Sequence, residues 1–246
     1  MTPTSFNPII VIPARMASTR LKHKPLADIH GKPMIRHVFE RASAANIGPV
    51  VVAAGDAEIC AVIRGLGGLC VLTDPGLPRG SDRIFAALEE IDRERRFDVV
   101  INMQSDQPTA EPRLLTDVLA CLADPAVDVG TLAVPLSHNP CDPNVVKVVL
   151  AGLSGGRGRC LYFSRLPVPQ KGPHFHHLGF YAYRRHALDA YARLPQSTLE
   201  LSEDLEQLRL LEAGYRYDAA VVDAAPLSVD TPADLEEARR VLRPRP

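Results

Sequence analysis

The feature that most constrains the fold is an unbroken run of β-branched residues near the start of the chain, Ile9-Ile10-Val11-Ile12, which ends at Pro13. Continuous rather than alternating hydrophobicity is typical of a strand buried on both faces, as in a parallel sheet. Later runs have the same character, at 50–54, 69–72, 99–101 and 127–134. Between these runs lie patterns with helical spacing, at 34–45, 57–66, 81–93 and 111–123. Strands that alternate with helices in this way predict βαβ units and an open α/β sheet.

The pattern changes beyond Thr131. Residues 145–150, a glycine-rich turn at 152–158 and residues 159–163 predict an antiparallel hairpin, and the stretch 167–173 predicts a loop. The remaining segments are, in order, a strand at 178–183, helices at 187–193 and 202–213, a strand at 217–222 and a closing helix at 231–242 that Thr231-Pro232 would begin. We therefore expect one α/β domain over 1–246, with a smaller β-rich excursion at 132–190.

Composition excludes several classes of protein. The 246 residues are 46% hydrophobic and 23% charged, with a formal net charge of −1, which is ordinary for a globular domain. Near-neutral charge lacks the basic excess of a general nucleic-acid binder. No apolar run approaches the roughly 18 residues that a membrane span needs. The N-terminus has no basic start followed by an apolar stretch, so we expect no secretory signal.

The cysteine and histidine patterns are uninformative about metals. The five cysteines are widely spaced and include no CxxC pair, so we expect neither a disulfide scaffold nor a cysteine zinc site. A reducing cytoplasm is the expected location. His174, His176 and His177 lie close together, but without an acidic or cysteine partner they are weak evidence for zinc.

The segment with the clearest chemistry directly follows the first predicted strand and reads PARMASTRLKHKPL, residues 13–26. It places several cations beside two hydroxyl side chains: Arg15, Arg20, Lys22, Lys24, Ser18 and Thr19. A loop after a buried parallel strand lies at the carboxyl edge of the sheet, where open α/β folds bind ligands. Such a loop suits a triphosphate, whereas the alternative is a solvated basic loop. Neither GxGxxG nor GxxxxGK[ST] is present, which excludes the dinucleotide fingerprint and the P-loop.

Two aspartates are candidates for a metal site. Asp106 comes shortly after the buried run 99–101, near the carboxyl end of a predicted strand, where a carboxylate can hold Mg²⁺. The alternative is a turn residue that caps the following helix. Asp230 precedes Thr231-Pro232, which is itself a good helix start, so the structural alternative is stronger there.

Sequence blocks from about residue 8 to residue 242 resemble one known family. The first, PARMASTRLKHKPLADIHGKPMIRHV, is shared with other sugar-nucleotide cytidylyltransferases. The later blocks are GSDR (80–83), NMQSDQP (102–108), TLAVP (131–135), NVVKVVL (144–150), LYFSR (161–165), HLGFYAYR (177–184), LEQLR (205–209) and VDTPADLE (229–236). The combination of HLGFYAYR and LEQLR is much more specific for a single family than this first block is. With these blocks the chain resembles the bacterial CMP-KDO synthetases, or 3-deoxy-manno-octulosonate cytidylyltransferases, where KDO is 3-deoxy-D-manno-octulosonate.

The resemblance implies a Rossmann-like open mixed sheet of the nucleotidyltransferase type, with a β-rich dimerisation excursion. It implies that Arg15, Lys24 and Asp106 are catalytic and that Asp106 and Asp230 together bind Mg²⁺. The implied nucleotide contacts are Ala14, Arg15, Ser18, Arg20, Lys24, Ser81, Arg83 and Gln104.

The second half of the chain would bind the sugar. His177 and Tyr181 are four apart, so on a strand they project from the same face, and both match sugar contacts of the family. Glu206 and Gln207 match further sugar contacts, although by themselves they resemble an exposed helix pair. Arg165 is a candidate for the sugar carboxylate, because its guanidinium suits bidentate recognition.

Some positions depart from the family pattern. Ser105 stands where the family has Gly, Gln107 where it has Glu, and Arg79 where it often has Ser. Ser105 would crowd the strand end if that position needs a positive φ, and Gln107 removes a negative charge beside the metal site. The loop 166–176, which would border the sugar site, is shorter than in the family.

The resemblance implies a Mg²⁺-dependent cytidylyltransferase that transfers CMP from CTP to the anomeric hydroxyl of KDO for lipopolysaccharide biosynthesis. The resemblance implies a cytoplasmic homodimer whose partners are CTP and an acidic octulosonate, with neither nucleic acid nor membrane. One alternative is CMP transfer to a related acidic keto-sugar, such as 8-amino-octulosonate. Another is a catalytically silent nucleotide-sugar binding protein, which the presence of both Asp106 and Asp230 disfavours.

Overall fold

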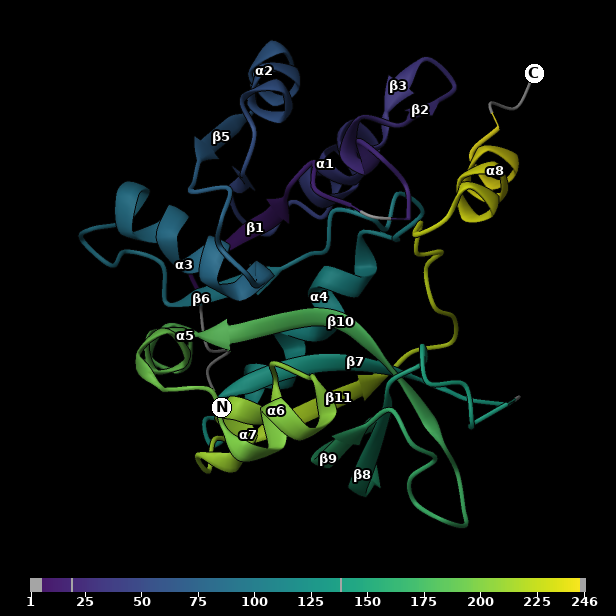
Figure 1. Ribbon diagram of the computed structural model, residues 1–246. Coiled ribbons are helices and arrows are strands. Elements are labelled where there is room, and N and C mark those ends of the chain that lie inside the picture. Colours follow the sequence, from purple (N-terminus) through teal and green to yellow (C-terminus); the bar gives the residue numbers. More distant parts are fainter. Residues whose placement is uncertain (1–5, 19, 138, 244–246) are drawn as a thin grey trace. The chain divides into compact units, whose positions relative to one another are not determined.

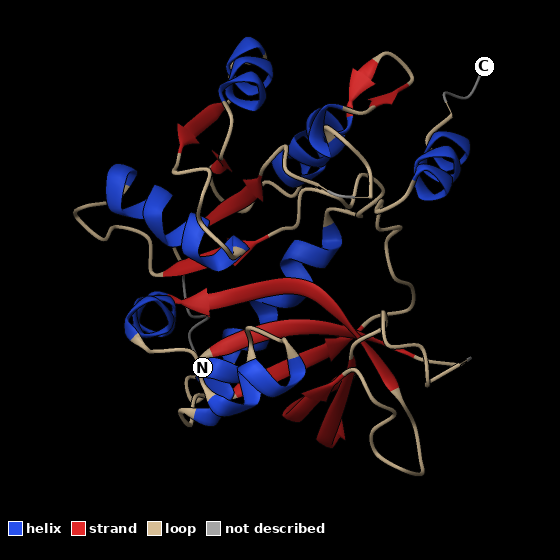
Figure 2. Ribbon diagram, viewed as in Figure 1, coloured by secondary structure: helices blue, strands red, loops and turns tan. Residues whose placement is uncertain are grey.

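The computed structural model describes residues 6–18, 20–137 and 139–243; Figure 1 labels its elements and Figure 2 colours them by type. The chain divides into two compact units. Unit 1 consists of Met1–Phe6, Asp98–Ile101 and Thr116–Ala225, and unit 2 consists of Asn7–Phe97, Asn102–Leu115 and Pro226–Pro246. Among the described residues, no helix has the length and apolar character that crossing a membrane requires.

Unit 2 contains parallel strands that alternate with helices. The strands lie in the order β5-β4-β1 and are β1 (Pro8–Ala14), β4 (Val50–Ala54) and β5 (Leu69–Leu72). The helices between and after them are α1 (Met34–Ala44), α2 (Ala57–Gly65) and α3 (Gly80–Ile91). Every residue of β1 is buried, which confirms the buried strand and the βαβ units that the apolar runs predicted.

Three short elements of unit 2 were not predicted. They are the 3₁₀ turn η1 (Lys24–Leu26) and the paired strands β2 (Asp28–Ile29) and β3 (Lys32–Pro33). Elements of two or three residues are too short to produce a hydrophobic period, so the sequence pattern could not have indicated them.

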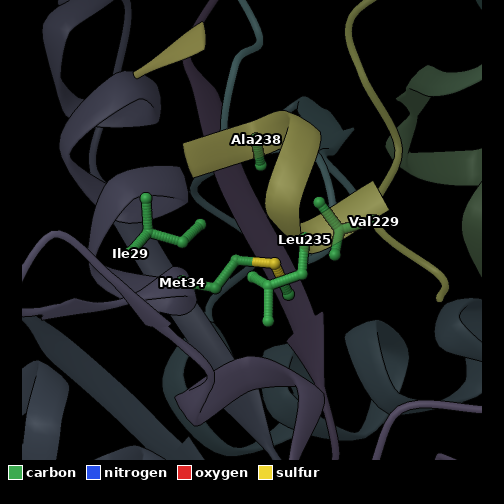
Figure 3. Packing of buried hydrophobic residues seen from close by; sticks show 5 residues of the cluster. All are labelled: Ile29, Met34, Val229, Leu235 and Ala238. Carbon is green, nitrogen blue, oxygen red and sulfur yellow. The ribbon is translucent and has the colours of Figure 1, made fainter. Parts of the chain in front are cut away.

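The helix α8 (Pro232–Val241) belongs to unit 2 and packs on the segment that follows the basic loop. Leu235 and Ala238 of α8 lie in one apolar cluster with Ile29, Met34 and Val229 (Figure 3). Burial of a Leu or Met side chain of this kind contributes about 2–5 kcal/mol. The cluster therefore holds the C-terminal segment of unit 2 firmly against its N-terminal part.

Unit 1 contains a mixed sheet. Its strands, in spatial order, are β6 (Val99–Asn102, whose last residue belongs to unit 2), β10 (Phe175–Arg184), β7 (Val129–Pro135), β11 (Tyr217–Val221), β9 (Arg157–Ser164) and β8 (Lys147–Ser154). β7 pairs with β11 in parallel and with β10 in antiparallel orientation, which confirms the expected mixed sheet. β8 and β9 form the predicted antiparallel hairpin, and α5 (Arg185–Arg193) follows β10.

The predicted helix at 202–213 is wrong, because the chain forms two shorter helices there, α6 (Thr198–Glu203) and α7 (Leu208–Glu212). The side chain of Ser197 caps α6, so this helix begins earlier than the hydrophobic pattern indicated. Asp204 then adopts a left-handed conformation with φ 51°, which ends α6. A turn, rather than a continuous helix, therefore separates α6 from α7.

Two other boundaries differ from the predictions. The hairpin turn predicted at 152–158 is shorter, because Gly155 and Gly156 have positive φ of 57° and 76° and allow the chain to reverse within two residues. The helix predicted at 111–123 is α4 (Arg113–Ala120) followed by the 3₁₀ turn η2 (Cys121–Ala123).

The structure contains one disulfide, which the cysteine spacing gave no reason to expect. Cys60 in α2 and Cys70 in β5 are bonded, with their Cα atoms 5.3 Å apart. The two residues come together because α2 leads directly into β5 and packs beside it. One bridge is not a disulfide scaffold, and Cys121, Cys141 and Cys160 are free thiols.

Candidate active site

The basic loop starts from a rigid point at the end of β1. The backbone N–H of Gly55 donates to the carbonyl oxygen of Ala14 at 2.9 Å, which continues the pairing of β1 with β4. Two residues further on, the N–H of Met16 donates to the Asp56 carboxylate at 2.7 Å. The loop therefore leaves the carboxyl end of β1 in a defined direction, as the sequence predicted.

A cavity of about 380 Å³ lies beside this loop in unit 2, a volume typical of small-molecule sites. Its lining includes the predicted site residues Ala14, Arg15, Ser18, Arg20, Lys24, Arg83, Gln104 and Asp106. Ser81 is not among the lining residues, because it is fully buried near the start of α3. Thr19, which the sequence placed beside the phosphates, lies outside the described residues.

Arg83 is almost completely buried, with 2% of its surface exposed. Its guanidinium donates to the Thr73 hydroxyl at 2.5 Å and to the Asp74 carbonyl at 3.1 Å. Burial lowers the pKa of Arg83, and the nearby positive charge of Arg15 lowers it further. Two cations that repel each other at the wall of a cavity are both stabilised when an anion enters, which favours a phosphate ligand.

Arg79 also lines the cavity and was not predicted as a site residue. It precedes α3, where its backbone N–H donates to the Asp82 carboxylate at 3.3 Å. Its position directly before the GSDR block was the signal that could have identified it. Arg79 therefore adds a further cation where the family often has a neutral Ser.

Asp106 and Asp230 lie side by side although 124 residues separate them, because the N–H of Val229 donates to the Asp106 carbonyl at 2.9 Å. Between the two carboxylates lies the Lys24 ammonium, 2.8 Å from Asp106 and 3.0 Å from Asp230. Arg20 reaches Asp230 as well, at 3.1 Å. The structure therefore brings two cations of the basic loop, Arg20 and Lys24, into contact with the two candidate metal ligands.

Neither aspartate is a helix cap. Thr231 is the N-cap of α8, where its hydroxyl accepts from the Asp234 N–H at 3.3 Å, and this leaves the Asp230 side chain directed at Lys24. The helix after Asp106 begins only at Arg113. Asp106 is therefore a turn residue without a capping role, and Asp230 directly precedes the cap of α8 rather than forming it.

The Lys24 ammonium is fully charged. Burial acts to lower its pKa, but the charges and hydrogen bonds of Asp106 and Asp230 more than offset this, so the pKa lies above its ordinary value. Two carboxylates that converge on one cation form a donor set that suits Mg²⁺, which takes few protein carboxylates and completes its shell with phosphates and water. Among the described residues, no group of three or more acidic, His or Cys side chains forms a closed metal cage.

The predicted sugar residues all lie in unit 1. The Thr131 hydroxyl donates to the Phe180 carbonyl at 2.7 Å, so it accepts from His177 Nε2, which is 2.9 Å away. Burial lowers the pKa of His177 to about 3, and His176 adds to this effect, so the imidazole is neutral at physiological pH. The rings of His177 and Tyr181 are 5.4 Å apart, which confirms that they share one face of the strand.

Of the other sugar candidates, Glu206 interacts with this pair. Burial raises the pKa of Tyr181 well above its ordinary value, and Tyr183 and Glu206 contribute, which places Glu206 within electrostatic reach of Tyr181. Gln207 is buried, with 4% exposed. Arg165 is partly exposed and donates to the Pro143 carbonyl at 3.1 Å, and no contact among the described residues joins it directly to His177.

Comparison with known proteins identifies the family. A family model described as cytidylyltransferase matches residues 9–219. A 3-deoxy-manno-octulosonate cytidylyltransferase of Paramagnetospirillum magneticum is 54% identical, over 96% of this chain and 98% of its own length. The chain belongs to the 3-deoxy-manno-octulosonate cytidylyltransferase family. A second relative with the same name, from Rhodospirillum centenum, is 52% identical over 100% of this chain and 97% of its own.

A solved structure supports the same assignment. It is described as a CMP:2-keto-3-deoxy-manno-octonic acid synthetase complexed with CTP, and it matches with a TM-score of 0.87 and 40% sequence identity. The match covers 96% of this chain and 98% of that one. The mixed α/β fold of this cytidylyltransferase is therefore that of a family member solved with its nucleotide.

The neutral state of His177 in this cytidylyltransferase predicts how the stability of the protein depends on pH. Between its ordinary pKa of 6.5 and its folded pKa of about 3, the unfolded chain binds a proton that the folded protein does not. Stability must therefore fall as the pH is lowered through this range, by about 2.5 kcal/mol between pH 7 and about pH 4.5 from this group alone. We expect His177→Gln to lose less stability over that interval in urea unfolding, whereas His23→Asn, at an exposed histidine, should behave like the wild type. Equal acid sensitivity of His177→Gln and the wild type would contradict the buried neutral state.

Proposed function

We propose that this protein transfers CMP from CTP to the anomeric hydroxyl of KDO, giving CMP-KDO and pyrophosphate. The observation that carries the proposal is the cationic cavity of unit 2, bordered by the Lys24, Asp106 and Asp230 cluster, in a chain more than half identical to named cytidylyltransferases. Cavity volume, positive charge and paired carboxylates are what a nucleoside triphosphate and its metal ion need.

The proposed reaction is a direct substitution at phosphorus. The anomeric hydroxyl of the sugar loses its proton to solvent water as its oxygen forms a bond to the α-phosphorus of CTP. The bond from that phosphorus to the bridging oxygen breaks, and pyrophosphate leaves with the electron pair. Such a transfer needs positioning and charge neutralisation rather than a covalent intermediate. Arg15 and Lys24 would bind the β- and γ-phosphates and stabilise the negative charge that develops on the leaving group. Ala14 and Gln104 would contact the nucleoside side of CTP.

The cofactor in this proposal is Mg²⁺, held by Asp106 and Asp230. When bound, it supplies positive charge at the α-phosphate and increases the acidity of the attacking hydroxyl. Because the Lys24 ammonium lies between the same two carboxylates, this side chain would have to turn towards the triphosphate in the ternary complex. Lys24 would thereby move from the carboxylates of the protein to the phosphates of the substrate.

The sugar would bind through the residues of unit 1. A neutral His177 with Nε2–H committed to Thr131 offers Nδ1 as a hydrogen-bond acceptor for a sugar hydroxyl. Glu206 and Gln207 would bind further hydroxyls, and the Arg165 guanidinium would bind the sugar carboxylate. We further propose a cytoplasmic homodimer that pairs through the β-rich excursion 132–190 and serves lipopolysaccharide biosynthesis.

The decisive experiment measures pyrophosphate release from CTP and KDO with Mg²⁺ and again with excess EDTA. We expect release that requires both the sugar and the metal, and none with ATP in place of CTP. Pyrophosphate release with 8-amino-octulosonate but not with KDO would identify 8-amino-octulosonate as the sugar substrate. CTP binding without release for either sugar would support the silent nucleotide-binding alternative and overturn the proposal.

A further inference from the structure

The turn between α6 and α7 carries Glu206 and Gln207. The flanking helices have only six and five residues, far too few to be stable by themselves. The backbone bonds of the turn run from Leu205 N–H to the Glu200 carbonyl, from Leu208 N–H to the Leu205 carbonyl and from Arg209 N–H to the Glu206 carbonyl, each at 3.2 Å, and they leave the side chains of Glu206 and Gln207 unspecified. Tertiary contacts must therefore define where Glu206 and Gln207 lie.

A buried ion pair supplies these contacts. Arg209 at the start of α7 donates from Nε and Nη2 to the two carboxylate oxygens of Glu200 in α6, at 2.7 Å each. Glu200 is fully buried and Arg209 is 7% exposed. Burial acts to raise the pKa of Glu200, but hydrogen bonds from Arg209 lower it below its ordinary value, so the pair is ionised. The ion pair therefore connects α6 to α7 on either side of the turn.

Tyr191 of α5 connects the ion pair to Glu206. The Arg209 guanidinium lies 4.1 Å from the centre of the Tyr191 ring, and its Nη1 donates to the Tyr191 carbonyl at 3.1 Å. The Tyr191 hydroxyl in turn donates to the Glu206 carboxylate at 3.4 Å. One arginine therefore fixes both the base of the turn and the ring that contacts Glu206.

Stability alone does not account for this arrangement. Removing two charges from water costs several kcal/mol, and apolar residues of similar volume often stabilise a fold as well as a buried ion pair does. The bidentate pair provides a fixed geometry, because both of its hydrogen bonds form in one orientation only. Apolar packing does not provide this.

We propose that Glu200, Arg209 and Tyr191 are positioning residues that hold Glu206 and Gln207 in the geometry required to bind the acidic sugar. The inference rests on the proposed function, in which Glu206 and Gln207 contact that sugar. Since none of the three residues lines the nucleotide cavity, we expect their loss to change recognition of the sugar and not of CTP.

The main test is the double variant Glu200→Leu/Arg209→Met, which replaces the pair by apolar side chains of similar volume. We expect a thermal midpoint close to that of the wild type, an unchanged KM for CTP and a KM for KDO raised about tenfold or more. The matched control is Arg185→Met/Asp189→Leu. It removes another poorly exposed ion pair of unit 1, between two residues of α5, with a separation of 3.3 Å. This control should leave both KM values unchanged.

Tyr191→Phe provides a second test that does not depend on the fold tolerating the double variant. It removes only the hydroxyl that contacts Glu206, so we expect a smaller rise in the KM for KDO and none for CTP. The proposal is overturned if both variants bind KDO like the wild type, or if the KM for CTP rises in parallel. Absence of KDO-dependent turnover in the wild type would instead contradict the proposed function.

Discussion

Replacing Asp106 by Asn should reduce the turnover of CTP and KDO by a factor on the order of 10²–10³ while the nucleotide still binds. Asn preserves the size of the side chain, so the loop after β6 keeps its shape, and the backbone bond from Val229 to residue 106 is unaffected. The substitution removes one of the two negative charges that face Lys24. The loss should therefore appear in kcat, which steady-state pyrophosphate release measures, and not in the affinity for CTP, which calorimetry without metal measures.

The control for Asp106→Asn is Glu40→Gln. Glu40 is also a carboxylate held by two cations, Lys32 at 3.2 Å and Arg36 at 2.7 Å, but it lies on the surface of unit 2 outside the cavity lining. Its variant should turn over at the wild-type rate. Near-normal turnover of Asp106→Asn would show that this carboxylate takes no part in the chemistry.

Replacing Lys24 by Met should have two opposite effects. Turnover should fall by about 10²-fold or more, because the leaving pyrophosphate loses a cation. Binding of Mn²⁺ to the nucleotide-free protein should become about tenfold tighter or more, because Asp106 and Asp230 lose the ammonium that neutralises them at 2.8 and 3.0 Å. Calorimetric titration with Mn²⁺ measures the second effect independently of activity.

Lys32→Met is the matched control for Lys24→Met. It removes a lysine of the same unit that pairs with a surface carboxylate, Glu40, and should change neither turnover nor metal affinity. Unchanged Mn²⁺ affinity in Lys24→Met would mean that Lys24 and the metal ion do not share the two carboxylates.

Much of the fold could be predicted because the strongest signals are local. A run such as Ile9–Ile12 has no polar position that could face water, so burial on both faces follows directly, and all of β1 is buried. Thr231-Pro232 combines a side-chain cap with a residue that suits the first helical turn, and α8 begins there. Signals of this kind depend only on neighbours in the chain.

Features that depend on distant residues or on single backbone conformations could not be predicted in this way. The break at Asp204 is a left-handed residue inside an apparently helical pattern. The bond between Cys60 and Cys70 depends on how α2 packs on β5. Asp230 reaches Asp106 across 124 residues, so only the family resemblance connected the two, and the bridging position of Lys24 required the structure.

The division of unit 2 into three separate stretches of chain has a consequence for biosynthesis. During translation, the ribosome delivers the basic loop and Asp106 well before Asp230, the last carboxylate of the cluster. A polypeptide interrupted before residue 230 lacks that carboxylate and also lacks Leu235 and Ala238, which cover Ile29 and Met34. The apolar surface exposed in such a fragment is what chaperones and proteases recognise. We therefore expect the proposed metal site and the apolar cover of Ile29 and Met34 to be completed in the same late step of synthesis, when α8 docks.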